Sequence, residues 1–394
     1  MTDPRGVTVP KSRWLLLAVP LALCGADPAI AGASGETGAG VREGARAAER
    51  AGAAAAYLDA QWGRPGGWNA SENWQRFVIV DALLDYQQRT GERQWSPRIA
   101  AAVRNREGLY LNDDALWAVI ASVHAWQVDR DPALLDYAGT TFGTLVTTYW
   151  DDRCGGGIWW DPKRSYKNAI TNELLFYAAT QLYLATGQAG YRDWALRSWQ
   201  WFRASSMIGA DGLVNDGLDG LCRNNGQARF TYNQGVLIGA LNDLTAITGD
   251  PQYRGVAVAA ALAATRRLST PAGILREPVG SLGADGLMFK GVFAYHLGHL
   301  LDAMPDSAER RELARWTAAN AEAVWRLSAA GTRGIAADWS LDAATWDAAR
   351  DGQTATAAAA AQVSGLAMLL AAMAAGGPPP RAVVQAEGGP EQAR

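Results

Sequence analysis

Two kinds of helical segment alternate along the chain. One kind carries apolar or small residues on nearly every face, as helices buried on all sides do; these segments begin near Ser71, Asn112, Lys167, Thr231, Met288 and Gly352. The other kind is amphipathic, with charged residues along one side; these segments begin near Arg42, Ile99, Pro132, Tyr191, Gln252 and Ser307. No run of alternating apolar and polar residues predicts a sheet. The pattern therefore predicts six helical hairpins.

Hairpins of this kind cannot bury their apolar faces alone, so they must stack on one another. We predict an all-α fold, an (α/α)6 barrel in which six inner and six outer helices form a toroid over residues 42–376. A superhelical solenoid is the competing arrangement, although a solenoid does not need long loops. No linker divides the chain, which favours one large domain.

The connections between helices are of two lengths. Short turns such as Thr90-Gly91, Thr186-Gly187 and Thr248-Gly249 follow buried helices and lead into amphipathic ones. Long loops precede the buried helices instead; they cover residues 151–166, 210–230, 271–287 and 331–351. In a closed barrel all the long loops lie at one end. We therefore expect the functional site at that end.

The composition narrows the class of partner. Charged residues make up 19% of the chain, its net charge is -3, and no basic stripe is present, so a nucleic-acid surface is not expected. Seventeen Trp and 12 Tyr against 7 Phe weight the aromatic residues toward rings with a polar group, which suit sugars. We expect a monomer that acts on a carbohydrate.

The N-terminus has the three zones of a secretory signal peptide over residues 1–31, with cleavage expected after Ala31. Residues 32–41 are expected to be flexible, and residues 377–394 to form a disordered tail. A lipoprotein anchored at Cys24 is the alternative, although the preceding residue is bulky. No later segment is predicted to span a membrane.

Removal of the signal leaves two cysteines, Cys154 and Cys222, each in a Gly-rich loop. An exported protein enters an oxidising compartment, so we predict a disulfide between them. Two unpaired thiols are the alternative. The three His residues show no ligand spacing, and neither a metal nor a cofactor is predicted.

Polar and aromatic residues at the starts of the buried helices converge at the long-loop end. Asp113 and Asp114 fall in the first turn of one of these helices, where they can be catalytic carboxylates or simple helix caps. The candidates for substrate binding are Trp74, Trp117, Trp159, Trp160, Asn168, Asn172, Asp216, Tyr232, Asn233, Gln234 and Lys290. For Asn172 a cap, and for Lys290 an ion pair with Asp285 or Glu277, is the structural alternative.

Several ordered motifs together resemble glycoside hydrolase family 76. They are Asp113-Asp114 followed by Trp117, Cys154 to Trp160, Tyr166 to Ala169 with Asn172-Glu173, Leu213 to Gly217, Cys222 to Asn225, Thr231 to Gly235 and Phe289 to Gly291. The resemblance covers about residues 45 to 370. Ala118 and Asn112 depart from the family pattern, which bears on subsite contacts and linkage preference.

The resemblance implies an (α/α)6 barrel that cleaves α-1,6-mannosidic linkages in mannan by a retaining double displacement. It assigns Asp113 as the nucleophile and Asp114 as the acid/base. Retaining glycosidases hold two carboxyl groups about 5 to 5.5 Å apart, a distance that neighbouring Asp residues can span. Two alternatives are a transglycosylase on the same glycan and a carbohydrate-binding wall protein without activity.

Overall fold

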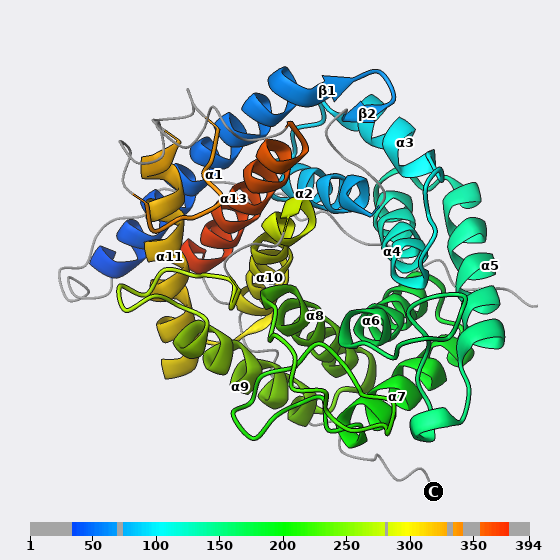
Figure 1. The fold of residues 1–394 in the computed structure, drawn as a ribbon. Helices are drawn as coiled ribbons and strands as arrows, with labels where there is room; N and C mark the ends of the chain where they lie inside the picture. Colours follow the sequence, from blue (N-terminus) through cyan, green and yellow to red (C-terminus); the bar gives the residue numbers. More distant parts are fainter. Residues whose placement is uncertain (1–33, 69–73, 280–282, 329–333, 342–354, 378–394) are drawn as a thin grey trace, which may run out of the picture.

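Twelve helices form two concentric rings in the computed structural model, which describes residues 34–68, 74–279, 283–328, 334–341 and 355–377. The inner ring consists of α2 (Gln75–Thr90), α4 (Asn112–Asp129), α6 (Ala169–Thr186), α8 (Thr231–Thr248), α10 (Gly283–Ala303) and α13 (Ala355–Gly376). The outer ring consists of α1 (Ser34–Trp62), α3 (Ser96–Arg104), α5 (Pro132–Tyr149), α7 (Ala189–Ala204), α9 (Pro251–Arg267) and α11 (Ala308–Leu327). Figure 1 looks along the common axis of the rings. The predicted (α/α)6 barrel is confirmed.

The short turns end the inner helices with a recurring local geometry. Gly91, Gly187 and Gly249 follow α2, α6 and α8 in the left-handed conformation, which glycine adopts at little cost. Outer helices α5 and α9 then begin with Pro after an Asp whose side chain accepts a backbone N–H. These short turns all lie at one end of the barrel, and the long loops lie at the opposite end.

Helix α13 closes the barrel between α1, α10 and α11. The segment Ala357–Gly376 is long and apolar enough to cross a membrane, but 83% of it is buried inside the fold. Its all-round apolarity is that of an inner barrel helix packed on every side.

The structure differs from the sequence-based expectations in one helix boundary and one short strand pair, and two predicted segments lie outside the residues that it describes. Helix α1 begins at Ser34, within the segment expected to be flexible. The loop after α1 contains a two-residue antiparallel pair, β1 (Gly63–Arg64) and β2 (Gly67–Trp68), which is too short to leave an alternating pattern. The predicted signal peptide over residues 1–31 and nearly all of the predicted C-terminal tail lie outside the described residues.

Candidate active site

A cavity of about 380 Å³ opens at the long-loop end of the barrel axis. The first turns of five inner helices and the loops before them surround it. Its lining residues are Trp74, Gln75, Leu111, Asp113, Asp114, Trp117, Trp160, Tyr166, Asn168, Asp216, Tyr232, Asp285 and Phe289. Among the described residues, four carboxyl groups and no cationic side chain line the cavity, which fits a neutral, hydroxyl-rich ligand better than an anion.

Asp113 lies in the first turn of α4 with its carboxyl group toward the cavity. Oδ2 accepts a hydrogen bond from Nε1 of Trp160 at 3.2 Å. Oδ1 is buried and has no hydrogen-bond partner among the residues that the structure describes. A buried carboxylate oxygen without a partner is costly unless a ligand uses it, so Oδ1 is the atom best placed to react.

Asp114 is a buried residue, with 4% of its surface exposed. Oδ2 accepts a hydrogen bond from the backbone N–H of Leu111 at 3.3 Å, as the acidic residue of a capping box does. Asp114 therefore fills the role of a helix cap and also contributes to the cavity wall. The cap fixes its carboxyl group beside that of Asp113.

Both carboxyl groups hold protons more tightly than ordinary Asp residues. Burial, followed by the charge of Asp114, raises the pKa of Asp113 to about 7. Burial raises the pKa of Asp114 to about 6, against the opposing effect of backbone hydrogen bonds. Near neutrality the pair therefore shares about one proton, the state that paired acid and nucleophile roles need.

Asn112 joins the start of α4 to the loop that carries Trp160. Its Nδ2 donates to the backbone oxygen of Trp159 at 2.7 Å, and its backbone N–H donates to the oxygen of Trp160 at 3.0 Å. These two bonds hold Trp160 where its indole reaches Asp113. The residue that departs from the family pattern thus has a positioning role in this chain.

Aromatic rings form the wall of the cavity. Trp74 stacks on Trp117 with ring centroids 5.4 Å apart, and Tyr232 stacks on Phe289 at 3.8 Å. Trp74 also packs near Phe289, which links the two pairs into one surface. Such rings can contact the apolar faces of sugar units while the carboxyl groups contact the hydroxyls.

Asp216 reaches the cavity from the loop between α7 and α8. It accepts a hydrogen bond from the Tyr166 hydroxyl at 2.7 Å, and that hydroxyl accepts one from Asn225 Nδ2 at 2.6 Å. Burial raises the pKa of Asp216. A Cβ on Gly217 would lie 2.5 Å from the Tyr166 hydroxyl, so glycine is needed for this close approach.

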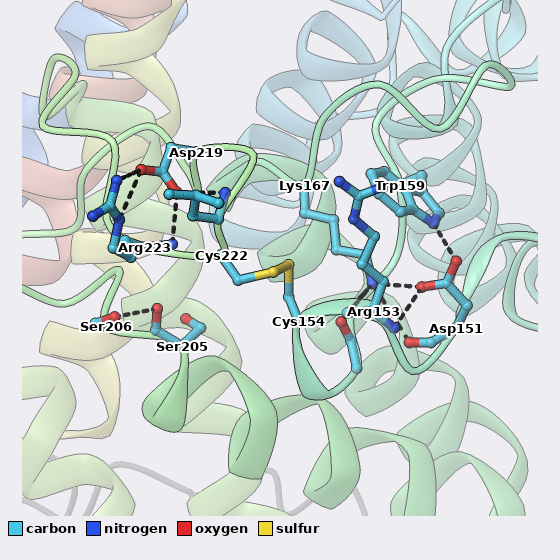
Figure 2. Close-up of a disulfide and its surroundings, with 12 residues drawn as sticks. Asp151, Arg153, Cys154, Trp159, Lys167, Ser205, Ser206, Asp219, Cys222 and Arg223 are labelled. Carbon is cyan, nitrogen blue, oxygen red and sulfur yellow. Dashed lines mark hydrogen bonds and ion pairs between the residues drawn. A yellow bond between two sulfur atoms is a disulfide. The ribbon is translucent and has the colours of Figure 1, made fainter.

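A disulfide ties the two loops that carry Trp160 and Asp216. Cys154 and Cys222 are bonded, with Cα atoms 5.2 Å apart and a sequence separation of 68 (Figure 2). Beside the disulfide, the buried Lys167 ammonium binds a carboxylate oxygen of Asp151 at 2.8 Å and two backbone oxygens of the same loop. The predicted disulfide is present. The disulfide and Lys167 together hold the loop that carries Trp160.

Eight of the predicted site residues line the cavity. They are Asp113, Asp114, Trp74, Trp117, Trp160, Asn168, Asp216 and Tyr232. Asn168 also caps α6 through the backbone N–H of Thr171. These residues come from four inner-helix starts and two loops, as expected for one shared mouth.

The structure corrects the placement of five other candidates, which lie outside the cavity lining. Trp159 is buried, donates to Asp151 and packs on Lys167. Its neighbour Trp160 faces the cavity because successive side chains of this extended loop point in opposite directions.

Asn172 and Gln234 hold loop backbone in place of substrate. Asn172 exchanges hydrogen bonds with Ile158, and Gln234 exchanges them with Val214. Asn233 is fully buried on α8 without a hydrogen-bond partner. The side-chain amides of Asn172 and Gln234 thus pair with the backbone amides of the two loops.

Lys290 is buried beyond the cavity wall. Its Nζ donates to the backbone oxygen of Ala337 at 2.5 Å and lies 4.1 Å from the Trp339 ring centroid. Burial lowers the pKa of Lys290 to about 8, and the charge of Glu277 opposes that shift. Among the described residues Lys290 forms no ion pair with Glu277 or Asp285; Glu277 instead accepts hydrogen bonds from Thr231, and Asp285 lines the cavity.

Five lining residues were absent from the predicted set: Gln75, Leu111, Tyr166, Asp285 and Phe289. Gln75 Nε2 donates to Asp285 Oδ1 at 3.0 Å, a contact between residues 210 positions apart. No local pattern marks such a contact. Tyr166 and Phe289 lie inside the family motifs, which was the available signal. Among the described residues, no group of three or more His, Cys, Asp or Glu is placed to hold a metal ion.

Comparison with known proteins places these features in context. The model of a family described as glycosyl hydrolase family 76 matches residues 45–381. A mannan endo-1,6-alpha-mannosidase of Saccharomyces cerevisiae is 27% identical over 311 residues, which cover 71% of this chain and 67% of the yeast protein. The protein of the same description from Candida glabrata is 27% identical over 307 residues, 70% of this chain and 68% of the relative.

The fold is shared with a bacterial structure. An inactive variant of an α-1,6-mannanase from a Salegentibacter species, with two adjacent aspartates replaced and α-1,6-mannotetrose bound, superposes with a TM-score of 0.71 at 23% identity. The match covers 83% of this chain and 98% of that one.

Proposed function

The chain belongs to glycosyl hydrolase family 76, and from this premise and the geometry of the cavity we propose that it cleaves α-1,6-mannosidic linkages in mannan-type polysaccharide. The observation that carries the proposal is the pair Asp113 and Asp114, two carboxyl groups with raised pKa values in one aromatic-walled cavity. The names of the curated relatives support the linkage.

The chain contains two pairs of adjacent aspartates, and their positions distinguish them. Asp113 and Asp114 line the cavity, whereas Asp151 binds Lys167 and Asp152 is exposed on a loop. The Salegentibacter variant that binds α-1,6-mannotetrose without activity lacks two adjacent aspartates. That description supports the first pair as the reacting groups.

The reaction is a retaining double displacement. The Asp113 carboxylate attacks the anomeric carbon of a mannosyl unit while Asp114 protonates the departing glycosidic oxygen, so a carbon–oxygen bond forms as another breaks. Asp114 then removes a proton from a water molecule that attacks the same carbon. Asp113 leaves, the α configuration is restored and Asp114 is protonated again.

The role assignment rests on the unpartnered oxygen of Asp113, since a nucleophile needs a free lone pair. The pKa values alone favour the opposite order, because the value of Asp113 is higher by about 1. Moving the shared proton from Asp113 to Asp114 costs about 1.4 kcal/mol on that scale. The hydrogen bond from Trp160 already lowers the pKa of Asp113, and without it this cost would be larger.

Incubation with linear α-1,6-mannan tests the function. We expect new reducing ends from the wild type and from the control variant Asp152→Asn, and none from the double variant Asp113→Asn/Asp114→Asn. Polymer retained on the wild-type protein without new reducing ends across pH 4 to 8 would contradict hydrolysis and favour a binding protein. Products longer than the starting chain at high acceptor concentration would show transglycosylation instead.

We also propose that the protein is exported. The disulfide between Cys154 and Cys222 supports this, since such bonds persist in oxidising compartments. N-terminal sequencing of protein recovered from the cell envelope or medium should begin at Gly32. A mature chain that retains Met1 would contradict export by signal cleavage.

A further inference from the structure

A second cavity lies at the short-turn end of the barrel, and nothing in the proposed reaction uses it. This basal cup has a volume of about 270 Å³. Its lining comes from the C-terminal halves of α2, α4, α6, α8 and α10, which surround the axis in Figure 1. Exposed Gln88 and half-exposed Leu184 form part of its rim, so the basal cup is accessible from solvent.

The basal cup is separate from the catalytic cavity. A small apolar void of about 20 Å³ lies between them and shares Trp117 with the cavity above and Tyr177 and His296 with the basal cup below. Val78 and Val292 complete the apolar layer. A ligand of the basal cup therefore enters from the short-turn end.

Negative charge exceeds positive charge around the basal cup. Asp85 pairs with Arg89 at 2.8 Å, and Asp81 pairs with His124 at 2.9 Å. Asp243 forms no ion pair within the described part of the chain; its carboxylate accepts a hydrogen bond from Gln181 Nε2 at 2.5 Å. Asp243 is thus the carboxylate without its own cation.

The helix ends add to this negative potential. Five inner helices direct their C-terminal ends toward the basal cup, and a helix C-terminus behaves as about half a negative charge. The catalytic cavity lies at the N-terminal ends of the same helices. The two ends of the barrel therefore favour ligands of different charge, with cations favoured at the basal cup.

Neutral acceptors also line the basal cup. His296 is 2% exposed and its Nδ1 has no hydrogen-bond partner. Burial lowers the pKa of His296 well below its ordinary value, so the ring stays neutral and keeps a lone pair. His299 Nε2 lies 3.6 Å from Asp85 Oδ1, too far for a hydrogen bond. Neither ring therefore adds a positive charge that would oppose a cation in the basal cup.

We propose that the basal cup binds a small organic cation that carries a primary ammonium group. Asp243 supplies the counter-charge, and the uncharged rings of His296, Tyr177 and Tyr295 line the cup beside it. No group of three or more His, Cys, Asp or Glu suited to a metal ion occurs among the described residues, which favours an organic cation over a metal.

Isothermal titration calorimetry with 1,4-diaminobutane tests the proposal. We expect saturable binding of the diamine, and no binding of 1,4-butanediol, which has a similar length but no charge. Potassium chloride at the same ionic strength should not compete. Equal binding of the diol, complete displacement by potassium, or no heat with the diamine would each overturn the proposal.

Two variants and a matched control locate the site. Asp243→Asn should weaken diamine binding at least tenfold, whereas Asp129→Asn, which removes a carboxylate from the C-terminal end of α4 outside the cup lining, should leave it unchanged. Leu184→Arg places a cation at the 48% exposed rim and should abolish binding without disturbing the core. Undiminished binding by the folded Asp243 and Leu184 variants would refute the site.

Discussion

The shared proton of Asp113 and Asp114 predicts a bell-shaped dependence of kcat/KM on pH. Hydrolysis needs one carboxyl group protonated and the other ionised. With pKa values of about 6 and about 7, the singly protonated pair reaches a maximum of about 60% near pH 6.5. Below about pH 6 the nucleophile is lost to protonation, and above about pH 7 the acid is lost to ionisation.

The size of the effect follows from the same two values. At pH 5 and at pH 8 about 9% of the molecules hold one proton on the pair, so kcat/KM should fall about sevenfold on each side. Initial rates on α-1,6-linked mannotetraose from pH 4 to 9 at constant ionic strength measure this directly. The exposed-loop control Asp152→Asn should give the same curve.

Two results would refute this reasoning. A rate that is constant from pH 5 to 8 would mean that neither carboxyl group titrates there. A fall on the acid side alone would mean that the acid stays protonated far above neutrality, and that burial and the neighbouring charge raise its pKa well beyond about 7.

Three further predictions concern the surroundings of the pair. Trp160→Phe removes the N–H that favours ionised Asp113, so the pKa of about 7 should rise, the alkaline limb of the profile should move to higher pH, and kcat/KM should fall by about 10- to 100-fold, as for a lost hydrogen bond to a charged group; an unmoved alkaline limb would contradict this. Cys222→Ser should lower the free energy of unfolding by about 4 kcal/mol on the chain-entropy model, since the cysteines are 68 positions apart in sequence; urea unfolding measures this loss, and two free thiols in the non-reduced wild type would contradict it. Burial raises the pKa of Glu173 well above its ordinary value, so the folded protein holds a proton that the unfolded chain releases, and stability should fall as pH rises above about 4.5; Glu173→Gln should reduce that slope, and an identical slope would show that Glu173 is not its source.

The helix pattern predicted the fold because burial on every side leaves a direct trace in sequence. Helices α6 and α8 contain few residues that water could contact, whereas α7 and α11 carry charges on one side. The turns Thr186-Gly187 and Thr248-Gly249 marked which end of the barrel has short connections. Each of these signals is local in the chain, so a single sequence was enough to predict the fold.

The site was predicted only as far as local signals reach. Asp113 and Trp160 were identified because they lie in motifs, but the contact between Gln75 and Asp285 joins positions far apart in the chain. Trp159 was misplaced because sequence does not show which of two neighbouring side chains faces the cavity. The unpartnered oxygen of Asp113 depends on packing by the whole barrel, which no short pattern records.

The central claim is that Asp113 is the nucleophile and Asp114 the acid/base. The most direct test is the turnover of an activated aryl α-mannoside by Asp113→Asn and Asp114→Asn, with and without azide. The leaving group needs little protonation, so Asp114→Asn should accumulate the glycosyl-enzyme, and azide should rescue it to give the α-mannosyl azide. Asp113→Asn should show almost no turnover without azide. A retained α-mannosyl azide from Asp113→Asn, or an inverted β-mannosyl azide from Asp114→Asn, would reverse the two roles, and near wild-type hydrolysis of mannan by both variants would contradict the site itself.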